Sequence, residues 1–165
     1  MTSKSDYSDA EWTRVKRAPF LAGMAISLAD PGGPIEAVKE SAATLKSVLA
    51  AAGGDVHGEL VQAIARDVRE DASHHKTPMA GFKPASGATA GVEILDELRE
   101  VDRLVAEKAT ADEVEDLRVW LVAVAQDAAN AAKEGGFMGF HAVRVSEGEQ
   151  RMLDQLRLAL GARAS

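Results

Sequence analysis

The chain has 165 residues, a formal net charge of −7, and a mixture of 46% hydrophobic and 27% charged residues. This composition is typical of one globular domain with a buried core and excludes a disordered polyelectrolyte. Because cysteine is absent, disulfides, thiolate metal sites and a cysteine nucleophile are excluded. The acidic balance disfavours nucleic-acid binding, and no apolar run reaches the roughly 18 residues of a membrane span. We therefore expect a cytoplasmic protein that binds neither nucleic acid nor membrane.

The first third of the chain reads as helix. Residues 1–7 are polar and are expected to form a disordered tail, which leaves 8–165 as a single helical domain. Ser8 and Glu11 have the spacing of a capping box, which predicts a helix start. Pro19 cannot donate a backbone hydrogen bond, so we expect this helix to kink or restart there. Residues 20–29 carry no charge on any face, which predicts a buried helix.

The middle of the chain alternates helices with glycine and proline. Asp30-Pro-Gly-Gly-Pro34 predicts a stop and a new start, and residues 35–52 follow with apolar side chains at helical spacing. Asp55 is expected to cap a third helix, which continues to Val68. Residues 72–88 contain two prolines and two glycines, which predicts a long irregular segment. Such segments in compact domains tend to be functional or mobile.

Three further helices are predicted in the last half. Thr89 can cap the fourth, and a capping box at Thr110 and Glu113 opens a long fifth helix whose centre is apolar on all sides. A third capping box, Ser146 with Glu149, opens the last helix, which Gly161 closes. No strand pattern is present. The sequence thus predicts an all-α, single-domain bundle of about six helices with the two apolar segments as central helices.

The segment Glu134-Gly-Gly-Phe-Met-Gly-Phe-His-Ala-Val-Arg-Val-Ser-Glu-Gly-Glu149 joins the last two helices. Its glycines permit tight turns, and two interpretations of its aromatic residues stay open. The phenylalanines either close one end of the bundle, or they form an exposed anchor for a partner. The candidate binding residues are Phe137, Met138, Phe140, His141 and Arg144.

A divalent metal ion is the alternative ligand of this segment. If the two Gly-Gly loops lie at the same end of the bundle, Asp30, Glu134 and His141 could converge on a cation. The competing interpretation is helix capping, since acids are common at helix starts. His74-His75 is either a surface pair or a weak zinc site. No nucleophile elbow or carboxylate pair is present, so enzymatic activity and a cofactor are not predicted.

Residues 134–146, together with 18–40, resemble an uncharacterised family of small bacterial helical proteins. Its members carry a similar segment, close to Glu-Gly-Gly-Phe-Leu-Gly-Phe-Gly-Gly-Val-Arg-Val-Ser, before their last helix; here His141 and Ala142 replace two glycines. The resemblance covers most of the chain and brings no activity with it. The order of apolar helix, acidic loop and Ser-x-x-Glu start is also distantly similar to the TerB-like tellurite-resistance domain. That similarity implies acidic metal-binding positions.

Two functions follow as expectations. The first is a non-enzymatic helical interaction module that forms homo-oligomers or binds a protein partner. Its contact surface would be the segment 134–145 or the segment 72–88. Neither segment is predicted to form part of the core or of a solvent-exposed helix face. The alternative is a TerB-like acidic metal-binding or stress-response protein.

Overall fold

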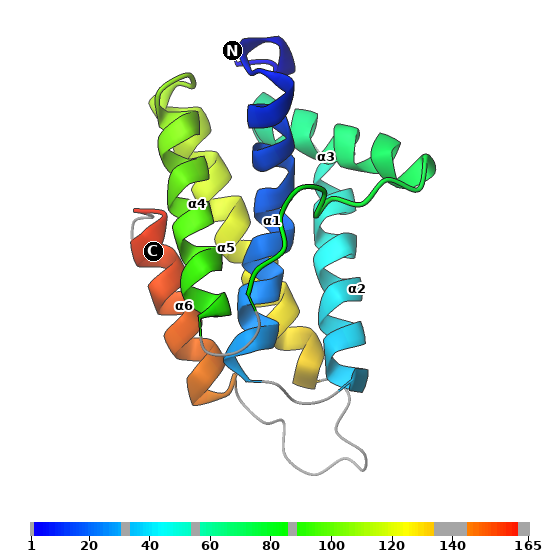
Figure 1. Cartoon of the computed structure of the whole chain (residues 1–165), viewed down its shortest axis with the longest axis vertical. Helices are drawn as coiled ribbons and strands as arrows, with labels where there is room; N and C mark the ends of the chain where they lie inside the picture. The colour runs from blue at the N-terminus through cyan, green and yellow to red at the C-terminus, as the bar shows by residue number, and fades with distance from the viewer. Residues whose placement is uncertain (1, 31–33, 54–56, 86–88, 134–144, 162–165) are drawn as a thin grey trace.

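A computed structural model describes residues 2–30, 34–53, 57–85, 89–133 and 145–161 of the chain (Figure 1). The described residues form six α-helices and a short 3-10 helix, and they contain no strand. The elements in chain order are η1 (Lys4–Asp6), α1 (Asp9–Ala29), α2 (Pro34–Ala51), α3 (Glu59–Ser73), α4 (Ala90–Ala106), α5 (Ala111–Lys133) and α6 (Glu147–Ala159). The predicted all-α bundle of about six helices is confirmed.

Helices α1 and α5 form the centre of the bundle. Each of the two contacts all the other helices, and Figure 1 shows α1 between α2 and α4. Leu21 and Ile26 of α1 and Leu121 of α5 are almost completely buried. Burial of each such side chain stabilises the fold by about 1.5–3 kcal/mol. The two segments without charge therefore lie where the sequence predicts them.

Pro19 does not interrupt α1. The helix runs continuously from Asp9 to Ala29 with Pro19 inside it, so the expected restart is wrong. A proline removes one helical hydrogen bond, and the flanking side chains explain why the helix persists. Ala18, Leu21 and Ala22 are fully buried against neighbouring helices, so their packing holds the two halves of α1 in line.

Local capping explains the starts of α1, α5 and α6. The boxes at Ser8 and Ser146 are both formed, and Thr110 exchanges hydrogen bonds with Glu113 in the same way. Helix α3 differs from the prediction, because its N-cap is Gly58 rather than Asp55. The Gly58 N–H donates to Oδ2 of Asp116 at 2.7 Å. A carboxylate from α5 thus caps α3, and no local pattern in the sequence shows it.

Residues 2–7, expected to belong to a disordered tail, pack on the bundle. The Thr2 N–H donates to Oε1 of Glu113 at 2.7 Å, and its hydroxyl donates to Oε2 at 2.8 Å. Tyr7 is buried, with its ring centroid 5.4 Å from that of Trp12. The Trp12 indole N–H in turn donates to Asp67 of α3 at 2.8 Å. The N-terminal segment therefore contacts α1 and α5.

The contact between Thr2 and Glu113 predicts that the free energy of unfolding decreases at acid pH. Burial would raise the pKa of Glu113, but hydrogen bonds from Thr2 and Thr110 outweigh it and lower the pKa from 4.5 to about 2. A lowered folded-state pKa stabilises the protein above the unfolded value, and this contribution is lost as pH falls from about 4.5 towards 2. Because Glu113 is partly exposed, we expect no more than about 1 kcal/mol. Urea unfolding of wild type and Glu113→Gln at several pH values measures it: the two should differ near neutral pH and converge near pH 2.

Helices α1 and α2 approach closely at Gly23. A Cβ atom built on Gly23 lies 2.8 Å from Cγ2 of Thr44 and nearer still to the Thr44 hydroxyl oxygen. Thr44 is buried, and its hydroxyl donates to the Glu40 carbonyl at 2.9 Å, so it has little freedom to move. Only glycine fits at this crossing of the two helices.

We expect Gly23→Ala to lower the free energy of unfolding by about 1–2 kcal/mol, since overpacking outweighs the gain in helix propensity. Gly91→Ala is the matched control, because its added Cβ would lie 3.6 Å from Cε of Met152, an ordinary contact. That variant should be neutral or slightly stabilised. Urea denaturation at neutral pH compares the two. Equal stability of Gly23→Ala and wild type would show that the helices do not meet closely here.

Candidate functional site

The site predicted from the sequence lies largely outside the described residues. Asp30 is described; it follows the last residue of α1, and its side chain is exposed. Its predicted companions Glu134, Phe137, Met138, Phe140, His141 and Arg144 are outside the described part of the chain. Whether these side chains converge with Asp30 therefore stays a prediction.

The helix ends on either side of both Gly-Gly loops do lie at one end of the bundle. Figure 1 shows the end of α1, the start of α2, the end of α5 and the start of α6 together at the bottom. A Cβ built on Gly148 would lie 2.6 Å from the Ala29 carbonyl oxygen, so the first turn of α6 touches the end of α1. Among the described residues, no group of three or more histidines and acids could hold a metal ion.

The predicted irregular segment forms a strap, which we define as residues 74–85. It leaves α3, crosses in front of α2 and α1, and leads towards the start of α4 (Figure 1). His75 has a φ of 56°, a left-handed conformation that costs a non-glycine residue free energy. The Lys76 N–H donates to the Asp71 carbonyl at 2.9 Å, which fixes the first turn of the strap. His74 and His75 are both exposed, as a surface pair would be.

A buried arginine holds the other end of the strap. Arg17 of α1 is 5% exposed, and its guanidinium donates to the Ala80 carbonyl and to Oε1 of Glu97 in α4, the latter at 3.2 Å. It also lies over the Phe82 ring, 5.3 Å from the centroid. Burial lowers the pKa of Arg17, and the carboxylate of Glu97 opposes this effect. Arg17 therefore joins α1, α4 and the strap.

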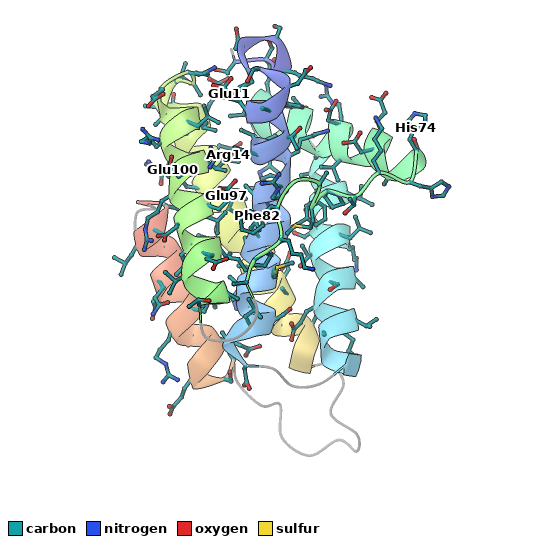
Figure 2. All side chains as sticks on the ribbon, viewed as in Figure 1. Glu11, Arg14, His74, Phe82, Glu97 and Glu100 are labelled. Carbon is teal, nitrogen blue, oxygen red and sulfur yellow. The ribbon has the colours of Figure 1, made fainter. Side chains whose placement is uncertain are left out.

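Glu97 receives a second arginine. Arg14 donates to its two carboxylate oxygens at 2.9 and 2.7 Å, and Figure 2 shows the two side chains meeting between α1 and α4. The hydrogen bonds from Arg14 to Glu97 raise the pKa of Arg14. The two arginines on one carboxylate thus form a structural link between α1 and α4.

A recess of about 540 Å³ lies beneath the strap, and we call it the strap pocket. Its walls come from α1, α2 and α3, and strap residues between His75 and Ala80 form its roof. A smaller recess of about 340 Å³ continues along α1 and α2 and shares Phe20 with it. The strap contributes to both recesses, since Met79 lines the smaller one.

A second hollow, the α2/α5 groove, lies between those two helices and has a volume of about 640 Å³. Small side chains line most of it: Ala43, Ser47, Ala50, Ala51, Ala123 and Ala131. Lys46 on α2 and Asp127 on α5 are its charged residues, and both are exposed. Trp120 forms part of the wall, and its buried indole N–H has no acceptor among the described residues.

His57 is the histidine among the described residues that line the α2/α5 groove. Nδ1 of His57 lies 3.6 Å from Oδ1 of Asp116, and Ser47 also lines the groove. A nucleophilic serine needs a hydrogen bond to its base, and no hydrogen bond joins Ser47 to His57 among the described residues. The other oxygen of Asp116 caps α3. The His57–Asp116 pair thus connects helices.

Comparison with family models, curated proteins and solved structures finds no match to this chain. No helix among the described residues is both long and apolar enough to cross a membrane. The geometry of the two hollows and of the strap is therefore the basis for a functional proposal.

The role of Arg17 predicts that its loss frees the strap. In Arg17→Met the Ala80 carbonyl and Phe82 lose their partner, whereas Glu97 keeps Arg14. We expect the amide hydrogens of Ala80 and Phe82 to exchange at least about tenfold faster, or ~1.4 kcal/mol of local stability. Hydrogen exchange followed by NMR measures this change.

Arg14→Gln is the matched control, because Arg14 binds the same carboxylate without touching the strap. It should leave strap exchange unchanged. If both variants accelerate exchange alike, the strap is held by the α1–α4 contact as a whole and Arg17 has no special role.

Proposed function

We propose that this chain is a helical interaction module that self-associates, with the α2/α5 groove as its contact surface. One observation carries the proposal: the walls of the α2/α5 groove combine small side chains with two opposite charges, one on each helix, that form no ion pair among the described residues. Lys46 lies on one wall and Asp127 on the other, and neither forms an ion pair within the described part of the chain. The module needs no catalytic group.

Small side chains favour close helix packing. The groove is lined by Ala43 and Ala50 on α2, which are one heptad apart, and by Ala123 and Ala131 on α5. These small side chains project little from either helix. A helix of another molecule can approach such a surface closely and gain dispersion contacts along its length. Val119, which is 52% exposed one turn before Ala123, extends the apolar part of this face.

The charges make the face self-complementary. Helices α2 and α5 lie side by side and run antiparallel (Figure 1). A twofold axis that lies in the interface and runs along the α2/α5 groove would place α2 of each copy opposite α5 of the other. In such a dimer each contact occurs twice. Lys46 of each copy would then face Asp127 of the second copy, and two ion pairs would form that the single chain does not make.

The TerB-like metal-binding function stays a prediction from the sequence. Two of its three candidate ligands, Glu134 and His141, lie outside the described residues, and Asp30 has no acidic or histidine cluster around it in the described part. The segment 134–145 likewise stays a predicted contact surface.

Charge reversal tests the self-association. Wild type should be dimeric by light scattering after gel filtration. Lys46→Glu and Asp127→Lys should each raise the dimer dissociation constant at least about tenfold, because each places like charges together at two symmetric positions. The double variant Lys46→Glu/Asp127→Lys restores opposite charges and should recover the dimer.

Lys83→Glu is the matched control. It makes the same charge change as Lys46→Glu, and Lys83 is an exposed strap residue that does not line the α2/α5 groove. This variant should dimerise like wild type. A wild type that stays monomeric at every concentration, or a double variant as weak as the single ones, would show that this face is not the contact surface.

A further inference from the structure

The strap pocket has a largely apolar lining and is partly open to solvent. Phe20, Leu45, Val68 and Pro78 supply apolar surface from three helices and the strap. Its volume of about 540 Å³ lies within the range of roughly 300–1,000 Å³ found for small-molecule sites. The interior can therefore accept the apolar body of a small ligand.

The charged groups around this pocket favour an anion. Lys16, His75 and Lys76 line it, and Asp71 is its single acid among the described lining residues. Asp71 is already paired, since it forms ion pairs with Lys16 and, at 3.6 Å, with Lys76. The chain carries no Asp or Glu at all from 72 to 92. The described lining thus has two lysines against one aspartate, but Lys16 is also paired with Asp67 at 3.3 Å, so the exposed Lys76 is the cation open to a ligand.

The roof of the pocket is fixed before any ligand arrives. The strap is held at Lys76 by the Asp71 carbonyl and at Ala80 by Arg17, and His75 is kept in a strained left-handed conformation. Strain of this kind tends to occur where a side chain must be presented in one orientation. A preformed pocket binds its ligand without the entropy loss of ordering a loop.

We propose that the strap pocket binds a small organic monocarboxylate, with its apolar body against Phe20, Leu45 and Val68 and its carboxylate at Lys76 and His75. One carboxylate matches Lys76, the exposed lysine of the lining, with the adjacent His75 imidazole as a second hydrogen-bond donor. The described lining residues include no arginine fork and no glycine-rich nest, which phosphate groups favour. Alkyl and aromatic bodies both suit the apolar lining, so both enter the test.

The probes are octanoate and 3-phenylpropanoate, each with its uncharged alcohol, titrated into the full chain and followed by amide NMR. We expect saturable shifts at Thr77 and Ala80 with one or both acids, and at least about tenfold weaker binding of the matching alcohol. Lys76→Ala should weaken the acid to the level of its alcohol. Lys76 is 67% exposed, so this change should not disturb the fold.

Ala72→Trp should abolish binding, because Ala72 is exposed at the end of α3 and its larger replacement would fill the strap pocket. Ala106→Trp, at an exposed position at the end of α4, is the matched control and should bind like wild type. Thermal melting confirms that both variants fold. Equal binding of acid and alcohol, unchanged binding by Ala72→Trp, or no shift with either acid would overturn the proposal.

Discussion

The arrangement of helices around the strap depends on the need to pair one buried guanidinium. The Arg17 side chain is buried inside the bundle, where an unpaired charge would cost several kcal/mol. Its Nη1 donates to Glu97 from α4 and its Nη2 to the Ala80 carbonyl from the strap, while its Nε has no acceptor among the described residues. Because these partners come from distant parts of the chain, the pairing fixes α4 and the strap relative to α1 at the same time.

The bundle has a different hollow on each side of α2. On the side of α1 and α2, the close approach at Gly23 narrows the distance between the helices, and the strap covers what remains as a pocket. On the side of α2 and α5, alanines line a groove that is open in the described part of the chain. Helix α2 contributes to both, so its two faces have separate roles in the proposals made for this protein: ligand binding on one face and self-association on the other.

The sequence predicts those features that depend on neighbouring residues. Ser8, Thr110 and Ser146 each find their capping partner three residues later, so three helix starts follow from the chain alone. The cap of α3 by Asp116 does not, because 58 positions separate donor and acceptor. Pro19 predicts a helix restart that does not occur, for a related reason: the packing of α1 against neighbouring helices outweighs the local effect of proline. The strap is predicted as irregular, yet its pocket and the α2/α5 groove require knowledge of which helices pack together, and a single sequence lacks this information.

The contact between Thr2 and Glu113 has a consequence for synthesis. It joins residues 111 positions apart, so Thr2 can meet its partner only after α1 to α4 have been synthesised. Contacts with such long separation add to the time needed for folding. The hydrogen bonds between Thr2 and Glu113 therefore require that the first turn of α5 is present.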